Sequence, residues 1–237
     1  MKKEEVCTLI DEIGIIPAIR VSSAEDAHFA AEAVMSGGIP IVEINMTVPG
    51  AVKLIAHLVH YHPKMLVGAG TILDTDTARH CVDAGAGFLT APSFDLKVVE
   101  FAAMENLAVL PGALTPTEVV TAWKAGSDFV KVFPCAPVGG DKYIRALNLA
   151  LPQIPLIAAG GVNQQTAANF ILSGATALGV GTELIPTESI ERRQAKRIRE
   201  LALRFAGFVK EARSRMEPRK KRDAAGKEAA IEKCEQR

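Results

Sequence analysis

A lysine stands in the middle of the apolar run DFVKVFPC, residues 128–135. Side chains of a β-strand alternate between its two faces, so Phe129, Lys131 and Phe133 would share one face. Burial among aromatic side chains disfavours the charged form of an amine. A neutral amine attacks carbonyl carbons and forms Schiff bases. Lys131 is therefore the first candidate for a catalytic residue.

Three other polar residues stand at or next to the ends of predicted strands. They are Arg20, Glu43 and Thr71, and alternation within each strand allows them to face the same interior as Lys131. A structural ion pair between Lys131 and Glu43 is the alternative, but such pairs are costly to bury. Ionisable groups in unfavourable surroundings cluster at functional sites, which favours chemistry.

Two glycine-containing turns indicate an anion site. Gly160 and Gly161 follow the seventh predicted strand, and Gly181 and Thr182 follow the eighth. Glycine lets backbone N–H groups approach a phosphate, and the loops after strands seven and eight are the usual phosphate site of a (β/α)8 barrel. Two tight turns are the alternative, but their position favours phosphate binding.

The elements that must position these residues alternate between short apolar runs and amphipathic helical segments. The predicted strands cover residues 15–20, 39–44, 65–70, 87–90, 107–112, 128–133, 154–159 and 176–181. Eight strands, each followed by a helix, predict an α/β protein with a (β/α)8 TIM barrel. A doubly wound sheet is the rival, but its phosphate loop would follow the first strand.

Length and composition indicate one domain with a tail. We assign the barrel to residues 1–212 and expect the charged segment 213–237 to be disordered. Lysine plus arginine and aspartate plus glutamate both number 27, so net charge gives no indication of nucleic-acid binding. One RKKR cluster in the tail is weak evidence for a nucleic-acid arm. No signal peptide or membrane span is apparent, so we expect a cytoplasmic protein.

Cysteine and histidine patterns give little support for a metal centre. The four cysteines form neither a zinc-ligand pair nor a disulfide framework. His57, His60 and His62 invite a metal hypothesis, but they fall at the end of a helix, opposite the strand ends, where solvent exposure is expected. Cys135, four residues after Lys131, is expected to be a small packing residue.

Eight segments together resemble the 2-keto-3-deoxy-6-phosphogluconate (KDPG) and 4-hydroxy-2-oxoglutarate (KHG) aldolase family. They are PAIR (17–20), GGIPIVEINMTVP (37–49), VGAGTIL (67–73), TAP (90–92), LPGALTPTE (110–118), FVKVFP (129–134), AGGV (159–162) and GVGT (179–182). The resemblance extends over about residues 5–210. It implies a class I aldolase, a lyase without metal or other cofactor, usually a homotrimer.

The resemblance also implies residue roles. Lys131 would form the Schiff base with the substrate and Glu43 would transfer protons. Arg20 and Thr71 would bind the carboxylate, Pro92, Phe133 and Ala159 would shape the pocket, and Gly160, Gly161, Gly181 and Thr182 would bind phosphate. The implied reaction is cleavage of KDPG to pyruvate and glyceraldehyde 3-phosphate, a step of Entner-Doudoroff carbohydrate metabolism.

Two departures from the family pattern leave the substrate open. Ala159 stands where gluconate-type enzymes commonly have threonine, whereas phosphogalactonate aldolases have an apolar residue there. Thr47-Val48 replaces an Arg-Thr pair of some members, which leaves more anion binding to Arg20. A phosphogalactonate or KHG aldolase is therefore an alternative. Rivals from other classes are a metal-dependent pyruvate aldolase, another phosphate-binding barrel enzyme, and a barrel that only binds sugar phosphates.

Overall fold

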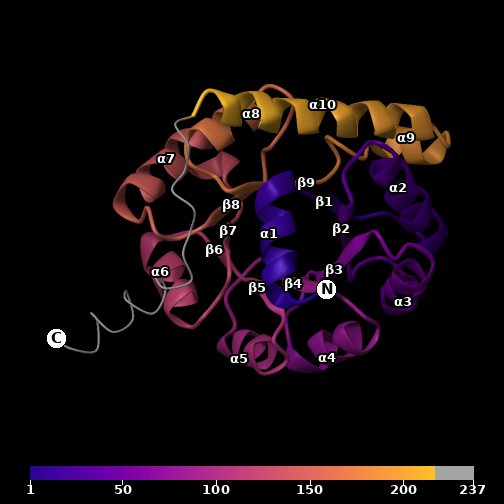
Figure 1. Ribbon diagram of the computed structural model, residues 1–237, viewed down its shortest axis with the longest axis horizontal. Coiled ribbons are helices and arrows are strands. Elements are labelled where there is room, and N and C mark those ends of the chain that lie inside the picture. The colour runs from indigo at the N-terminus through magenta and orange to yellow at the C-terminus, as the bar shows by residue number, and fades with distance from the viewer. Residues whose placement is uncertain (217–237) are drawn as a thin grey trace.

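The computed structural model describes residues 1–216, in which nine parallel strands curl into a nearly closed barrel surrounded by helices (Figure 1). The strands are β1 (Ile15–Ile19), β2 (Ile41–Asn45), β3 (Leu66–Gly70), β4 (Phe88–Thr90), β5 (Ala108–Leu110), β6 (Gly112–Ala113), β7 (Val130–Val132), β8 (Leu156–Ala159) and β9 (Ala177–Val180). Their order in the sheet is β5-β4-β3-β2-β1-β9-β8-β7-β6. The predicted α/β barrel is confirmed.

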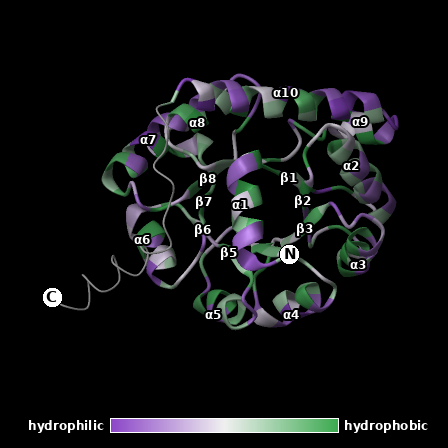
Figure 2. Cartoon of the chain, in the orientation of Figure 1, coloured by the Kyte–Doolittle hydropathy of each residue, from purple (hydrophilic) through white to green (hydrophobic). Residues whose placement is uncertain are grey.

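The helices of the described chain are α1 (Lys3–Ile13), α2 (Ala24–Ser36), α3 (Ala51–Tyr61), α4 (Thr75–Asp83), α5 (Leu96–Met104), α6 (Pro116–Lys124), the 3-10 helix η1 (Ala136–Val138), α7 (Asp141–Ala150), α8 (Ala167–Leu172), α9 (Thr187–Glu191) and α10 (Ala195–Ser214). Helices α2 to α8 lie between successive strands, whereas α1 precedes β1 and α9 and α10 follow β9. The apolar faces of the helices turn inward and their polar faces outward (Figure 2). No helix of the described chain is both long and apolar enough to cross a membrane.

The fifth predicted strand is divided in two at Pro111. Its first part, β5, pairs with β4, and its second part, β6, pairs with β7, so the two lie at opposite ends of the sheet order. Proline has no N–H to donate to a neighbouring strand, and the carbonyl of Pro111 accepts the N–H of Lys131 at 2.9 Å. The chain thus passes from one sheet edge to the other here, which brings the edges together.

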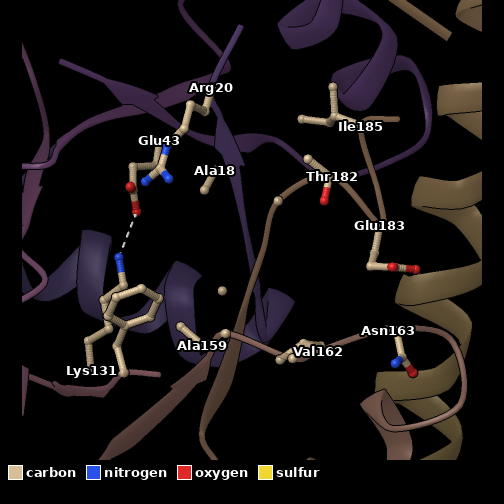
Figure 3. A pocket seen from close by; sticks show the side chains of 15 residues that line it. Ala18, Arg20, Glu43, Lys131, Ala159, Val162, Asn163, Thr182, Glu183 and Ile185 are labelled. Carbon is tan, nitrogen blue, oxygen red and sulfur yellow. Dashed lines mark ion pairs between the residues drawn. The ribbon is translucent and has the colours of Figure 1, made fainter. Parts of the chain in front are cut away.

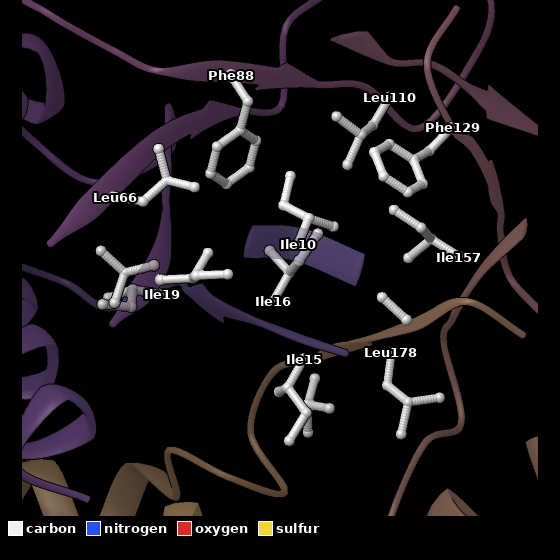
Figure 4. Close-up of a cluster of buried hydrophobic side chains, with 14 of the residues drawn as sticks. Ile10, Ile15, Ile16, Ile19, Leu66, Phe88, Leu110, Phe129, Ile157 and Leu178 are labelled. Carbon is white, nitrogen blue, oxygen red and sulfur yellow. The ribbon is translucent and has the colours of Figure 1, made fainter. Parts of the chain in front are cut away.

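Helix α1, which the sequence analysis did not predict, lies across the N-terminal end of the barrel (Figure 1). Gly14, with φ 68°, ends this helix and turns the chain directly into β1. Ile10 is fully buried and meets Ile16, Phe88 and Phe129 inside the barrel (Figure 4). This end of the barrel is therefore filled with apolar side chains, and space for a ligand is left at the opposite end.

The last helix, α10, holds the N-terminal segment in place through its C-terminal turn. The Arg213 guanidinium donates to the backbone carbonyls of Glu12 at 2.6 Å, Asp11 at 2.5 Å and Thr176 at 2.9 Å. Helix α10 continues to Ser214, so the predicted domain boundary at residue 212 falls inside a helix. Most of the predicted tail, residues 217–237, lies outside the described residues.

We expect Arg213→Met to lower the free energy of unfolding by about 2 kcal/mol, because hydrogen bonds to charged groups contribute about 1.5–3 kcal/mol each and are not additive. The matched control is Arg215→Met, an exposed arginine of the same turn. Denaturant unfolding followed by circular dichroism measures both. Equal stability of the two variants would contradict a structural role for Arg213.

Candidate active site

Lys131 and Glu43 face each other across the C-terminal half of the barrel (Figure 3). Lys131 lies in β7 and Glu43 in β2, and Lys131 Nζ is 3.6 Å from Glu43 Oε2. Their side chains are only 14% and 4% exposed, so this is a buried acid–base pair. Small residues occupy the paired positions on the neighbouring strands. Ala18 and Gly68 are paired with Glu43, and Gly112 is paired with Lys131. They leave room for a ligand next to the pair.

A cavity of about 360 Å³ opens from this pair toward the outside. It is lined by Ala18, Arg20, Glu43, Lys131, Phe133, Ala159, Gly160, Gly161, Val162, Asn163, Gly179, Gly181, Thr182, Glu183 and Ile185. Nine of the eleven predicted site residues belong to this lining, and they come from strands that are far apart in the sequence. Arg20 points into the cavity near Glu43 (Figure 3), which brings a guanidinium group to the same end as Lys131.

Two predicted site residues, Thr71 and Pro92, do not belong to the cavity lining. Thr71 accepts a hydrogen bond from the buried amide of Asn45 at 3.2 Å, and Asn45 also accepts from the hydroxyl of Thr47 at 2.8 Å. Pro92 packs its backbone against Gly112, where a Cβ would collide with it. Thr71 therefore contacts the end of β2 and Pro92 contacts the start of β6.

Glycines form the outer end of the cavity. Gly160 and Gly161 have φ 76° and 97°, backbone values that favour glycine, and a Cβ on Gly161 would collide with Ala136. At Gly181 a Cβ would meet only Ala18 O, at 3.9 Å, so glycine here keeps the cavity wide. The sequence analysis missed Glu183, which lines the same end and is exposed.

Cys135 lies close to the cavity but is protected from it. Its thiol is fully buried and donates to the carbonyl of Val132 at 3.1 Å. Burial raises the pKa of this thiol to about 11. A protonated, buried thiol is a poor nucleophile, so the expected packing role of Cys135 is confirmed.

Thr90, at the end of β4, is a polar residue to which the sequence analysis assigned no role in the site. It is 2% exposed, and its hydroxyl is the buried side-chain oxygen without a hydrogen-bond partner among the described residues. A Cβ added to Gly70 would collide with both Thr90 Oγ1 and Glu43 Oε1, so these two oxygens pack against the same glycine. Only the strand-end position of Thr90 was visible in the sequence.

Matches to known proteins cover most of the chain. The family model described as KDPG and KHG aldolase matches residues 6–201. The 2-dehydro-3-deoxy-phosphogluconate aldolase of Pseudomonas aeruginosa is 29% identical over 209 residues, covering 86% of this chain and 95% of that protein. The 2-dehydro-3-deoxy-6-phosphogalactonate aldolase of Escherichia coli K12 is 31% identical over 202 residues, covering 84% and 94%.

Solved structures give the same result. A structure described as native KDPGal has a TM-score of 0.77 at 30% identity and covers 84% of this chain and 96% of its own. A KDPG aldolase from Legionella pneumophila, with pyruvate captured as a covalent carbinolamine intermediate, has a TM-score of 0.77 at 27% identity, covering 83% and 96%. A thiamine phosphate pyrophosphorylase from Pyrococcus furiosus, with 17% identity and a TM-score of 0.65, shares the fold alone.

The unpaired hydroxyl of Thr90 predicts a gain in stability on its removal. Thr90→Val keeps the side-chain shape and should raise the free energy of unfolding by about 1–2 kcal/mol, because a buried hydroxyl without a partner is unfavourable. Thr90→Ser retains the hydroxyl and should show no gain. Chemical denaturation of the ligand-free protein measures both. A Thr90→Val variant no more stable than Thr90→Ser would show that water already satisfies this oxygen.

Proposed function

The chain belongs to the KDPG and KHG aldolase family, and on that premise we propose that it cleaves KDPG to pyruvate and glyceraldehyde 3-phosphate as a class I aldolase. One observation carries the proposal: Lys131 and Glu43 form a buried pair at the inner end of a cavity. A barrel that only binds sugar phosphates has no need of an amine opposite a carboxylate in its interior.

The first half of the proposed reaction is imine formation. The neutral amine of Lys131 attacks the C2 carbonyl carbon of the substrate, and loss of water from the carbinolamine gives an iminium. Glu43, 3.6 Å from Nζ, is close enough to exchange protons with the carbinolamine directly or through one water. Arg20 lies on the same side of the cavity and would pair with the carboxylate of the pyruvate half.

The second half is cleavage of the C3–C4 bond. Glu43 removes the proton of the C4 hydroxyl while the electrons of the C3–C4 bond move into the iminium, which becomes an enamine. The aldehyde leaves, the enamine carbon is protonated by Glu43, and hydrolysis releases pyruvate and free Lys131. Because the iminium accepts the electron pair, no step requires a metal ion. Thr90, whose unpaired hydroxyl packs against Gly70 as Glu43 Oε1 does, would hold the water or hydroxyl that Glu43 deprotonates.

The outer end of the cavity would receive the distal phosphate. Gly160, Gly161 and Gly181 expose backbone there, and the Thr182 hydroxyl lies beside them. Glu183, at the same end, would repel a dianion within contact distance, so the phosphate would bind toward the glycines. The homotrimer and the cytoplasmic location implied by the family resemblance stay predictions.

The galactonate epimer of the substrate is a second candidate, because Ala159 has no hydroxyl group. It is 4% exposed and lines the cavity between Lys131 and the glycine turn. A relative named for the galactonate substrate is 31% identical, and one named for the gluconate substrate is 29% identical. Sequence identities of 29% and 31% do not distinguish the two substrates, so a direct assay with both epimers is needed.

Reduction with borohydride in the presence of pyruvate tests the proposed roles of Lys131 and Glu43. Wild-type protein should acquire one pyruvyl adduct on the peptide that contains Lys131, and Lys131→Ala should show neither adduct nor cleavage. Glu43→Gln should still form adduct while its cleavage rate falls by about 10²–10⁴, the usual contribution of general acid–base catalysis.

The outcome of that test must be separated from a loss of folding, because breaking a merely structural buried pair costs about 3–5 kcal/mol. Melting temperatures recorded alongside turnover make the distinction. A folded Glu43→Gln protein with near wild-type turnover would remove Glu43 from the mechanism. An adduct on another lysine would exclude Lys131 as the Schiff-base residue.

Ala159→Thr should shift substrate preference toward the gluconate epimer. One added hydrogen bond contributes about 1 kcal/mol, so the ratio of kcat/KM for KDPG over its galactonate epimer should rise about five- to tenfold. Ala159→Val adds similar volume without a hydroxyl and is the matched control. Pyruvate release measured with both epimers and with 4-hydroxy-2-oxoglutarate gives the ratios, and an equal shift in both variants would attribute the preference to size alone.

A further inference from the structure

A group of imidazole and carboxylate side chains lies on the outer surface, away from the cavity. His28 and Glu32 lie one turn apart on α2, and His62 follows the last residue of α3. One ligand atom from each of the three residues lies within 4.8 Å of the others. We infer that these residues bind a transition-metal ion of the zinc class between α2 and α3.

The distances in this group are unsuited to direct hydrogen bonds. Glu32 Oε2 is 3.7 Å from His28 Nδ1, and Glu32 Oε1 is 3.6 Å from His62 Nε2. Hydrogen bonds to nitrogen are about 2.7–3.2 Å long. Ligand atoms around a tetrahedral zinc ion, with bonds of about 2.0–2.2 Å, lie about 3.4 Å apart. The two observed distances, one to each oxygen of the Glu32 carboxylate, are longer than hydrogen bonds and close to this separation of ligand atoms.

The backbone holds these ligands in place. Glu32 and His28 are four residues apart on α2, whose opposite face is anchored by the fully buried Ala27, Ala30 and Ala31. The backbone N–H of His62 donates to Leu58 O and its carbonyl accepts from Met65 N, both at 2.8 Å. The His28 and His62 side chains are 30% and 21% exposed, so an ion can reach them while part of each ring stays packed.

The donor set indicates which ions would bind. Two imidazole nitrogens and one carboxylate oxygen suit Zn²⁺, Co²⁺, Ni²⁺ or Cu²⁺, whereas Mg²⁺ and Ca²⁺ prefer all-oxygen sites. Three protein ligands leave one tetrahedral position for water. The ion would bridge α2 and α3, the helices that follow β1 and β2. Because it binds only the folded chain, it would raise the free energy of unfolding.

His57 and His60 are the other histidines of α3, and they help to delimit the site. The His57 ring packs edge-on against His28, with centroids 5.2 Å apart, but His57 does not belong to the three-residue group. His60 is exposed and contacts Tyr61. The sequence analysis expected His57, His60 and His62 all to face solvent. His62 instead turns toward Glu32.

Calorimetric titration of the full chain with ZnCl₂ tests the inference. The wild-type protein should bind one Zn²⁺ at this site, and His28→Asn, Glu32→Gln and His62→Asn should each weaken that binding at least tenfold. The matched control His60→Asn removes an imidazole from the same helix and should bind like wild type. Zn²⁺ should also raise the melting temperature of wild type and His60→Asn, while Mg²⁺ should not.

Two outcomes would overturn the inference: no saturable binding of Zn²⁺, or equal affinity of His62→Asn and His60→Asn. Circular dichroism and pyruvate release of the apo variants show whether each is folded. Chelation should leave cleavage intact, because the proposed reaction uses Lys131 and no metal. Loss of cleavage on chelation, restored by a divalent ion, would contradict the Schiff-base proposal. The Zn²⁺ titration alone decides whether the His28, Glu32 and His62 site exists.

Discussion

The burial of an amine and a carboxylate 3.6 Å apart inside an apolar barrel is the constraint on which the rest of the structure depends. Desolvation of two such groups costs several kcal/mol that their mutual attraction offsets only in part. The apolar layer beneath them supplies the compensating stability, with Ile10, Phe88 and Phe129 filling the N-terminal half of the barrel (Figure 4). Helix α1 covers that layer, and Arg213 binds the carbonyls at its end.

The same constraint explains why small residues occupy the layer around the pair. Three of its four in-register neighbours are Ala18, Gly68 and Gly112, and larger side chains there would fill the barrel as they do below. At Gly68 the absent Cβ leaves space for the ring of Phe88, and at Gly70 it leaves space for the side-chain oxygens of Thr90 and Glu43. Packing and catalysis thus use glycine for different reasons in the same strand, β3.

Local periodicity predicted the barrel and the polar residues at the strand ends, and the family resemblance implied the remaining pocket residues. Lys131 was recognisable as a polar residue in an apolar strand, and its inward direction followed from alternation. Helix α1 was missed because it covers the barrel end instead of connecting two strands. The break at Pro111 was missed because closure of a sheet depends on contacts between its two edges. Thr71 was expected in the phase of the inward residues, but Gly68 and Gly70 are the inward residues of β3, and the Thr71 hydroxyl accepts from Asn45.

Contacts between distant segments account for what no sequence pattern indicated. Thr90 and Glu43 are in different strands, and only folding shows that their side-chain oxygens pack against the same residue, Gly70. Glu32 and Glu43 have similar geometry in different surroundings, since each carboxylate lies about 3.6 Å from a side-chain nitrogen. Glu43, buried beside an amine, is suited to proton transfer in a low-dielectric cavity. Glu32, half exposed between two imidazoles, has geometry suited to a metal ion. Burial and the identity of the partner, more than residue type, determine the chemistry of each carboxylate.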